Sequence, residues 1–245
     1  MWLWMAVLSG LGWGQDVEQS LTWSIRAGGS EIGHRDVTVK FVKTDAGVRR
    51  IIESWTELNG AVGPIPVSMR QRMTVHASGR DPGSFHSVME FNGVPQEVQA
   101  RWTPAAWWVT TNVNGNKRTV DIPVSQVNIS TADLMDPDSG LPLSRFDNVR
   151  ILSAETGEIL TGPVEDLGLR TVTIGSDEVQ VHGYGWKSPT GRSVFYFSSE
   201  GHLVEYSMKL MGIDIQGILT EPPPPGLDDF PVAVGGPAVE KLPLD

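Results

Sequence analysis

Cysteine is absent from the 245-residue sequence. Disulfide bonds, thiolate nucleophiles and cysteine-ligated zinc or iron–sulfur sites are therefore excluded. The five histidines include no His-x-His or His-x-x-x-His pair, the spacings that place two imidazoles on one face of a strand or a helix. They are His34, His76, His86, His182 and His202. We expect no metal site and no cofactor.

The local motifs of common enzyme classes are also missing. The sequence has no Gly-x-Ser-x-Gly elbow, no glycine-rich phosphate loop ending in Lys-Ser or Lys-Thr, and no Gly-x-Gly-x-x-Gly. Residues 136–140 begin like a calcium loop, but Leu141 stands where the turn glycine belongs, so we expect a simple turn. No catalytic residue is predicted. A hydrolase with a site assembled from scattered His, Ser and Asp side chains remains an alternative.

Positive charge and long apolar runs are both scarce. The 19 basic residues are outnumbered by 29 acidic ones, for a formal net charge of −10. Nucleic acid needs a basic footprint, so we expect no nucleic-acid partner. Electrostatic docking on anionic lipid is disfavoured for the same reason. No stretch beyond the amino end approaches 18 uninterrupted apolar residues, so we expect no membrane span.

The two ends differ in character from the body. Residues 2–8 are apolar, and Gly12 and Gly14 suit the −3 and −1 positions of a signal-peptidase site, although no Lys or Arg precedes the run. We expect a signal peptide at 1–14 and a periplasmic or secreted protein; an N-terminal apolar strand or a packed amphipathic segment is the alternative. No cysteine follows the cleavage site, so a lipoprotein anchor is not expected. Residues 221–245 are rich in proline and predict a flexible tail.

The body, residues 15–220, is dominated by short turn signals between alternating apolar and polar runs. Asn59-Gly60, Asn92-Gly93 and Asn114-Gly115 are examples, and such pairs tolerate the positive φ of tight hairpins. About ten to twelve strands follow, too many for one sheet to stay flat and open. We predict a single, mainly β domain: a strongly curved antiparallel sheet, forming an open or incomplete barrel, with one or two short helices. Residues 125–135 are the main helical candidate, and 164–167 suggest one helical turn.

Tryptophan is the remaining clue to function. Trp107 and Trp108 are neighbours in a predicted strand, so their rings point to opposite faces of the sheet. A bent sheet with apolar groups on its concave face can hold an apolar ligand. The candidate ligand-binding residues are therefore the tryptophans of the body and one methionine of the closing hairpin. They are Trp55, Trp102, Trp107, Trp108, Trp186 and Met208. Core filling plus one surface tryptophan is the simpler reading.

A family likeness rests on two short motifs. Trp23-Ser24-Ile25 followed by residues 31–34, and the closing run at 194–204, resemble the first and last hairpins of uncharacterised β domains from the periplasm of Gram-negative bacteria. The same module is similar to one found beside bacterial transglutaminase-like domains. The resemblance implies the curved open barrel of lipoprotein-carrier proteins and no established catalytic residues. The sequence departs from the pattern at Ser199, where Asp is usual.

These observations lead to a non-enzymatic, exported β domain. We expect it to bind an apolar ligand, such as a lipid or lipopeptide, or a protein partner on its curved sheet. A structural or scaffold component of the cell envelope is one alternative, and the hydrolase is the other. The concave face discriminates among them: an apolar cavity favours a carrier, and a filled interior favours a scaffold.

Overall fold

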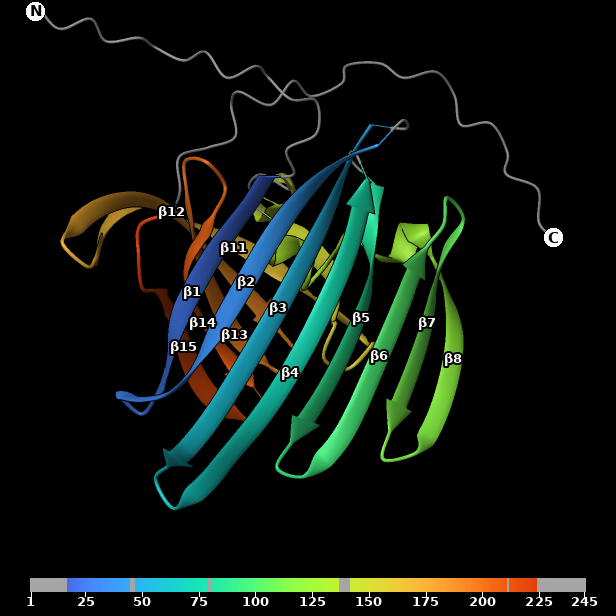
Figure 1. The fold of residues 1–245 in the computed structure, drawn as a ribbon, viewed down its shortest axis with the longest axis horizontal. Coiled ribbons are helices and arrows are strands. Elements are labelled where there is room, and N and C mark those ends of the chain that lie inside the picture. The colour runs from blue at the N-terminus through green and yellow to red at the C-terminus, as the bar shows by residue number, and fades with distance from the viewer. Residues whose placement is uncertain (1–16, 45–46, 79–80, 137–141, 211, 224–245) are drawn as a thin grey trace, which may run out of the picture.

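The computed structural model describes residues 17–44, 47–78, 81–136, 142–210 and 212–223 (Figure 1). The predicted signal peptide, most of the proline-rich tail and most of the predicted turn at 136–140 lie outside these residues. The described residues contain one sheet of 15 strands. The predicted fold class, a mainly β open barrel, is confirmed, whereas the predicted ten to twelve strands were too few.

The first half of the sheet is a meander of eight long strands, each antiparallel to the next. The strands are β1 (Val17–Ala27), β2 (Ser30–Thr44), β3 (Gly47–Val62), β4 (Ile65–Ser78), β5 (Asp81–Phe91), β6 (Val94–Trp102), β7 (Ala106–Val113) and β8 (Asn116–Pro123).

The chain then turns inward before it builds the second half. That half contains β9 (Ile129–Ser130), β10 (Asn148–Leu152), β11 (Ile159–Ile174), β12 (Asp177–Ser188), β13 (Gly191–Ser198), β14 (Leu203–Leu210) and β15 (Ile213–Leu219). The two halves join where β1 pairs with β15. The order is β8-β7-β6-β5-β4-β3-β2-β1-β15-β14-β13-β12-β11-β10-β9, so the sheet is open, with β8 and β9 at its edges. Figure 1 shows β1–β8 as a curved wall in front of the later strands.

Two-residue alternation divides most strands into a buried and an exposed face. In β4, Met69 and Met73 are buried whereas Arg70 and Arg72 are exposed. Trp107 is 1% exposed and its neighbour Trp108 is 54% exposed, as expected for side chains on opposite faces of a strand. The buried faces meet inside the curve in one hydrophobic cluster that includes residues of most strands.

Tight turns form at two of the three Asn-Gly pairs. Asn92-Gly93 and Asn114-Gly115 form the predicted turns, with φ of 48° and 80° in the first and 50° and 85° in the second. The prediction of a turn at Asn59-Gly60 was wrong, because both residues pair within β3 and β4. The turn lies further on, around Gly63, whose φ is 58°.

Both helical predictions were wrong. Residues 125–135 contain only 3₁₀ turns at η1 (Val124–Gln126) and η2 (Asp133–Met135), with β9 between them. Polar side chains there bind the backbone in place of a helical ladder: Asp133 accepts the Ser130 N–H at 2.6 Å, and Asn128 accepts the Arg150 N–H at 2.8 Å. Residues 164–167 belong to β11, where they pair with β12.

The described residues between β8 and β11 fill the concave side of the sheet. We call residues 124–158, described except for 137–141, the inner segment. It contains η1, β9, η2, η4 (Pro142–Arg145) and β10, and its apolar side chains belong to the central cluster. Leu143, Val149, Ile151, Leu152 and Ala154 are all fully buried. The interior of the curved sheet is therefore occupied by the protein's own chain.

Candidate functional site

Two polar contacts and one close backbone approach attach the inner segment to the inner face of β1–β8, which we call the front wall. Arg50 of β3 pairs with Asp136, with Nη2 and Oδ2 3.0 Å apart and both side chains largely buried. The Gln96 amide of β6 donates to the Glu155 carbonyl. Gly157 lies against β6 and β7, where an added Cβ would come within 2.4 Å of Thr111 Cγ2. These contacts bring the segment from β3 across to β7.

A second polar group lies between the two halves of the sheet. Arg35 of β2 donates from Nε to Thr56 Oγ1 at 2.9 Å, and its Nη1 lies 3.6 Å from Met135 Sδ. The same guanidinium lies 5.6 Å from the centre of the Tyr206 ring. Burial raises the pKa of Tyr206, an effect that the charge of Arg35 opposes and that of Glu155 supports. The cluster joins β2 and β3 of the first half of the sheet to β14 of the second half, around Met135 of the inner segment.

Four of the six predicted ligand-binding residues face this filled interior. Trp107 and Trp186 are buried, and Trp102 and Met208 are half-buried against the same cluster. The indole N–H groups of Trp102 and Trp186 have no hydrogen-bond partner in the described residues. These four side chains pack with other parts of the chain, as core residues do.

The other two predicted residues, Trp55 and Trp108, lie on the outer face. Trp55 of β3 is 41% exposed and stands directly opposite Arg72 of β4. Arg72 in turn stands opposite Val88 of β5, which is 48% exposed. Trp108 of β7 lies between Arg101 of β6 and Asp121 of β8. The structure thus divides the predicted set between two faces.

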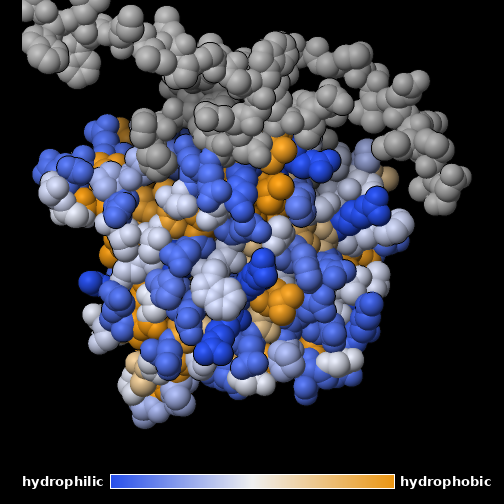
Figure 2. Space-filling model, in the orientation of Figure 1, coloured by the Kyte–Doolittle hydropathy of each residue, from blue (hydrophilic) through white to orange (hydrophobic). Residues whose placement is uncertain are grey.

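The sequence offered no sign of Arg72 and Val88 as neighbours of Trp55, because the strand register that aligns them is not a local property. We call Trp55, Arg72 and Val88 the outer patch. Figure 2 shows the outer face of the front wall as a mainly hydrophilic surface interrupted by separate apolar spots.

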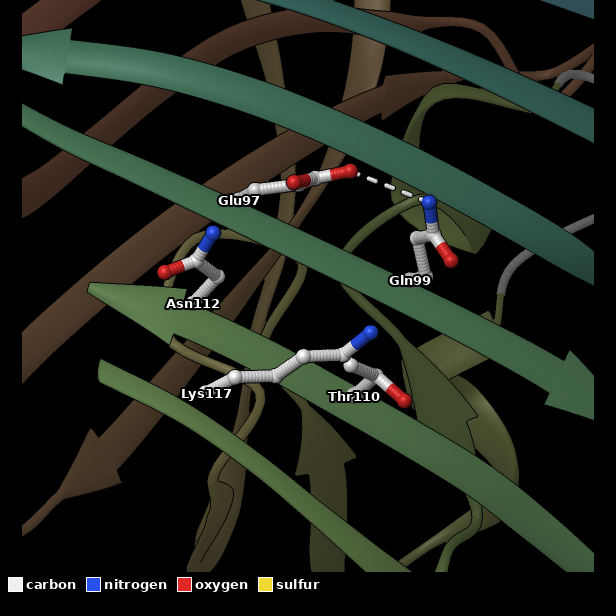
Figure 3. Close-up of a pocket in the computed structure, with 5 residues that line it drawn as sticks. All are labelled: Glu97, Gln99, Thr110, Asn112 and Lys117. Carbon is white, nitrogen blue, oxygen red and sulfur yellow. Dashed lines mark hydrogen bonds between the residues drawn. The ribbon is translucent and has the colours of Figure 1, made fainter. Parts of the chain in front are cut away.

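Two hollows open at the surface of the described residues. One, of about 50 Å³, is lined by polar side chains of β6, β7 and β8, with Gln99 donating to Glu97 at 3.0 Å (Figure 3). The other, of about 340 Å³, opens beside Arg26 and Ile174 where β1, β15 and the end of β11 meet. No tryptophan lines either hollow.

Three of the histidines, His34, His86 and His182, lie beside carboxylates, and His182 also stacks on the Tyr184 ring. His86 Nε2 lies 2.8 Å from Glu97 Oε1, and His182 Nε2 lies 2.6 Å from Asp166 Oδ1. Neither pair includes a serine or threonine hydroxyl, which a hydrolase would need as its nucleophile. Among the described residues, no three His, Asp or Glu side chains are grouped to hold a metal ion.

Comparison with protein families gives a match over residues 23–220. The matching model is described as a domain of unknown function, DUF6134. The chain belongs to this family. The match takes in every strand from β2 to β15 and residues 23–27 of β1. None of the curated proteins compared matches the chain.

A solved structure is similar in fold to this DUF6134 member. It is the crystal structure of a beta-barrel-like protein of the domain of unknown function DUF1849 from Brucella abortus. The TM-score is 0.55 at 10% sequence identity, and the alignment covers 82% of this chain and 95% of the other. At this identity the likeness shows the fold alone. Neither match indicates an enzyme family. Among the described residues, no helix is long and apolar enough to cross a membrane.

Proposed function

We propose that this chain is an exported, non-catalytic domain of the periplasm that binds a protein partner through the outer face of β3–β8. The observation that carries the proposal is the exposure of Trp55 and Trp108 on that face while the inner face is covered by the inner segment. Tryptophan and arginine are the residues most enriched in the energetic centres of protein interfaces.

The outer patch has the composition of such a centre. Trp55 and Val88 supply apolar surface, and Arg72 between them can donate two in-plane N–H hydrogen bonds to a carboxylate. No carboxylate of the described residues forms an ion pair with Arg72, whereas Glu53 and Glu57 beside it are paired with Lys40 and Arg70. The complementary partner surface therefore carries a carboxylate next to an apolar side chain.

An apolar ligand on the concave face is the second candidate. Its support is the apolar lining, which includes Trp107, Trp186 and Met208. Such a ligand would have to displace the inner segment, breaking the Arg50–Asp136 ion pair and exposing fully buried side chains. A protein partner on the outer face needs no such change, so we favour it. A scaffold role in the envelope agrees with the same filled interior.

Site-specific photo-crosslinking in the native bacterium tests the proposal. A photoreactive residue at position 55 or 88 is expected to give one discrete adduct, which Arg72→Glu abolishes. Ser207, exposed on β14 in the second half of the sheet, is the matched control position and should give no adduct. Equal adducts from all three positions, or none from 55 and 88, would contradict the proposal.

A fluorescence titration separates the second candidate. Vesicles of phosphatidylethanolamine and phosphatidylglycerol, and a synthetic lipopeptide, are added to the purified protein while tryptophan emission is recorded. We expect no saturable change, because the interior is already filled. A saturable blue shift that disappears in a Trp186→Phe variant would favour the apolar ligand instead.

A further inference from the structure

The strand β8 forms one open edge of the sheet. It pairs with β7 on one side, and no strand of the described residues pairs with it on the other. Its residues are almost all exposed, with only Val120 half-buried and Ile122 buried. In Figure 1, β8 lies at the right-hand end of the front wall. Exposed edges of this kind present unpaired backbone groups that can pair with another chain.

The register with β7 shows which backbone groups of β8 are free. Just beyond the strand, Val124 donates its N–H to the Ala105 carbonyl at 3.2 Å, in the same register as the β7–β8 pairs. Hydrogen-bonded positions alternate along an antiparallel pair, so every second residue from Val124 back to Asn116 bonds to β7. The N–H and C=O groups of Lys117, Thr119 and Asp121 therefore point to the open edge.

The sequence of these free positions is self-complementary. Antiparallel pairing of β8 with a second β8, centred on Thr119, places Lys117 opposite the partner's Asp121 and Asp121 opposite the partner's Lys117. Both side chains are on the outer face, and neither has an ion-pair partner among the described residues. Opposite charges directly across two strands stabilise their pairing.

We propose that two copies of this chain associate edge to edge through β8, as a two-fold symmetric dimer with one continuous sheet. The pairs at positions 117 and 121, and Thr119 with the partner's Thr119, use the free backbone groups for about six hydrogen bonds, two from each pair. Pro123 is the next position facing the edge; it has no N–H and ends the ladder.

The opposite edge of the sheet does not offer an equivalent surface. β9 has only two residues and pairs in parallel with β10. Beyond β10, β11 is irregular at Asp166–Gly168, where its pairing with β12 shifts register. Pairing of β8 with that edge of another copy would also be head-to-tail, and such contacts do not close unless a ring forms. The symmetric β8 contact closes with two copies.

Charge reversal provides the test, using the full chain as it is purified. In a homodimer of Lys117→Glu, a carboxylate at position 117 faces the carboxylate of Asp121 in both pairs. In a homodimer of Asp121→Lys, an ammonium group at position 121 faces that of Lys117 in both pairs. Each should weaken self-association about tenfold or more, because two attractive contacts become repulsive. An equimolar mixture of the two variants restores both ion pairs, so a heterodimer should form.

Sedimentation velocity from about 5 to 500 μM suits the weak association expected of an interface below about 1,200 Å². Lys187→Glu, the same charge change at an exposed position of β12, should dimerise like the wild type. Thermal unfolding followed by circular dichroism verifies that every variant is folded. A wild type that stays monomeric over this range overturns the proposal. So do single variants that dimerise normally, or a mixture that does not associate. These outcomes are independent of the crosslinks at positions 55 and 88.

Discussion

Replacement of Gly217 by alanine tests how tightly the second half of the sheet is packed. Gly217 of β15 stands directly opposite Tyr206 of β14, whose ring lies over it. A Cβ at Gly217 would lie 2.2 Å from Tyr206 Cε1, 2.3 Å from Cζ and 2.7 Å from the hydroxyl oxygen. Carbon atoms in contact normally lie about 3.5–4.0 Å apart, so the ring would have to move by more than 1 Å or so.

The ring has little room for that movement. Tyr206 is 1% exposed, and the Arg35 guanidinium lies 5.6 Å from its centre. Overpacking of this kind costs about 1–3 kcal/mol. Alanine also restricts the unfolded chain, which offsets about 0.4–1 kcal/mol. We therefore expect Gly217→Ala to lower the free energy of unfolding by about 1–2 kcal/mol. In a domain of this size the melting temperature would fall by about 2–8 °C.

Gly185→Ala is the matched control. An added Cβ there would meet the ends of Arg192 and Glu165, at 3.1 Å and 3.4 Å, and both side chains are exposed and flexible. Its stability should stay within about 0.5 kcal/mol of the wild type. Urea denaturation of both variants, repeated in a Tyr206→Leu background, is the assay. The packing argument is wrong if Gly217→Ala is as stable as the wild type. It is also wrong if Gly217→Ala lowers the free energy of unfolding by the same amount in the Tyr206→Leu background.

Three further predictions concern the inner segment and the two faces. Asp136→Ala breaks the largely buried ion pair with Arg50 and should lower the free energy of unfolding by about 3–5 kcal/mol, measured in urea. Burial raises the pKa of Asp133, against hydrogen bonds from Ser130 and the charge of Arg50. An acid of raised pKa favours folding below its unfolded pKa and loses that contribution as the pH rises through the folded pKa. Asp133→Asn removes this loss, so the free energy of unfolding of the variant, relative to that of the wild type, should increase as the pH rises through the pKa of Asp133; urea denaturation at several pH values measures it, and a pH-independent difference would contradict this. Acrylamide should quench the fluorescence of Trp108 strongly and that of Trp107 weakly, because only the Trp108 side chain is exposed. The contribution of each tryptophan is the difference between the wild type and the Trp108→Phe or Trp107→Phe variant.

Apart from the fold class, the properties that the sequence predicted correctly are local ones. Alternation along a strand decides which side chains share a face, so Trp107 and Trp108 could be assigned to opposite faces without any knowledge of their neighbours. The hairpins at Asn92 and Asn114 depend on two turn residues each. Asn59-Gly60 carries the same local signal but pairs within β3 and β4, so even this signal is overruled where long strands continue through it.

The properties that the sequence did not predict depend on distant contacts. Residues 125–135 show an apolar spacing that suits a helix, but β9 forms there because Ile129 and Ser130 pair with Ile151 and Leu152. The outer patch depends on the register of three strands, which aligns Trp55 with Arg72 and Arg72 with Val88. The sequence could not show that some candidate tryptophans lie in a filled interior and others on an outer surface, because this depends on where the inner segment packs.

The inward turn after β8 links the filled interior to the open edge. Pro123 has no N–H for a further strand, and the chain leaves the sheet there to pack its apolar side chains inside the curve. The segment that could have covered the edge fills the concave side instead. The outer face and β8 can each bind a partner without displacing the inner segment. Trp55 on β3 lies five strands away from β8 in the sheet order. A partner on the outer patch and a second copy on β8 can consequently bind at the same time, so that a dimer would present two outer patches on one continuous sheet.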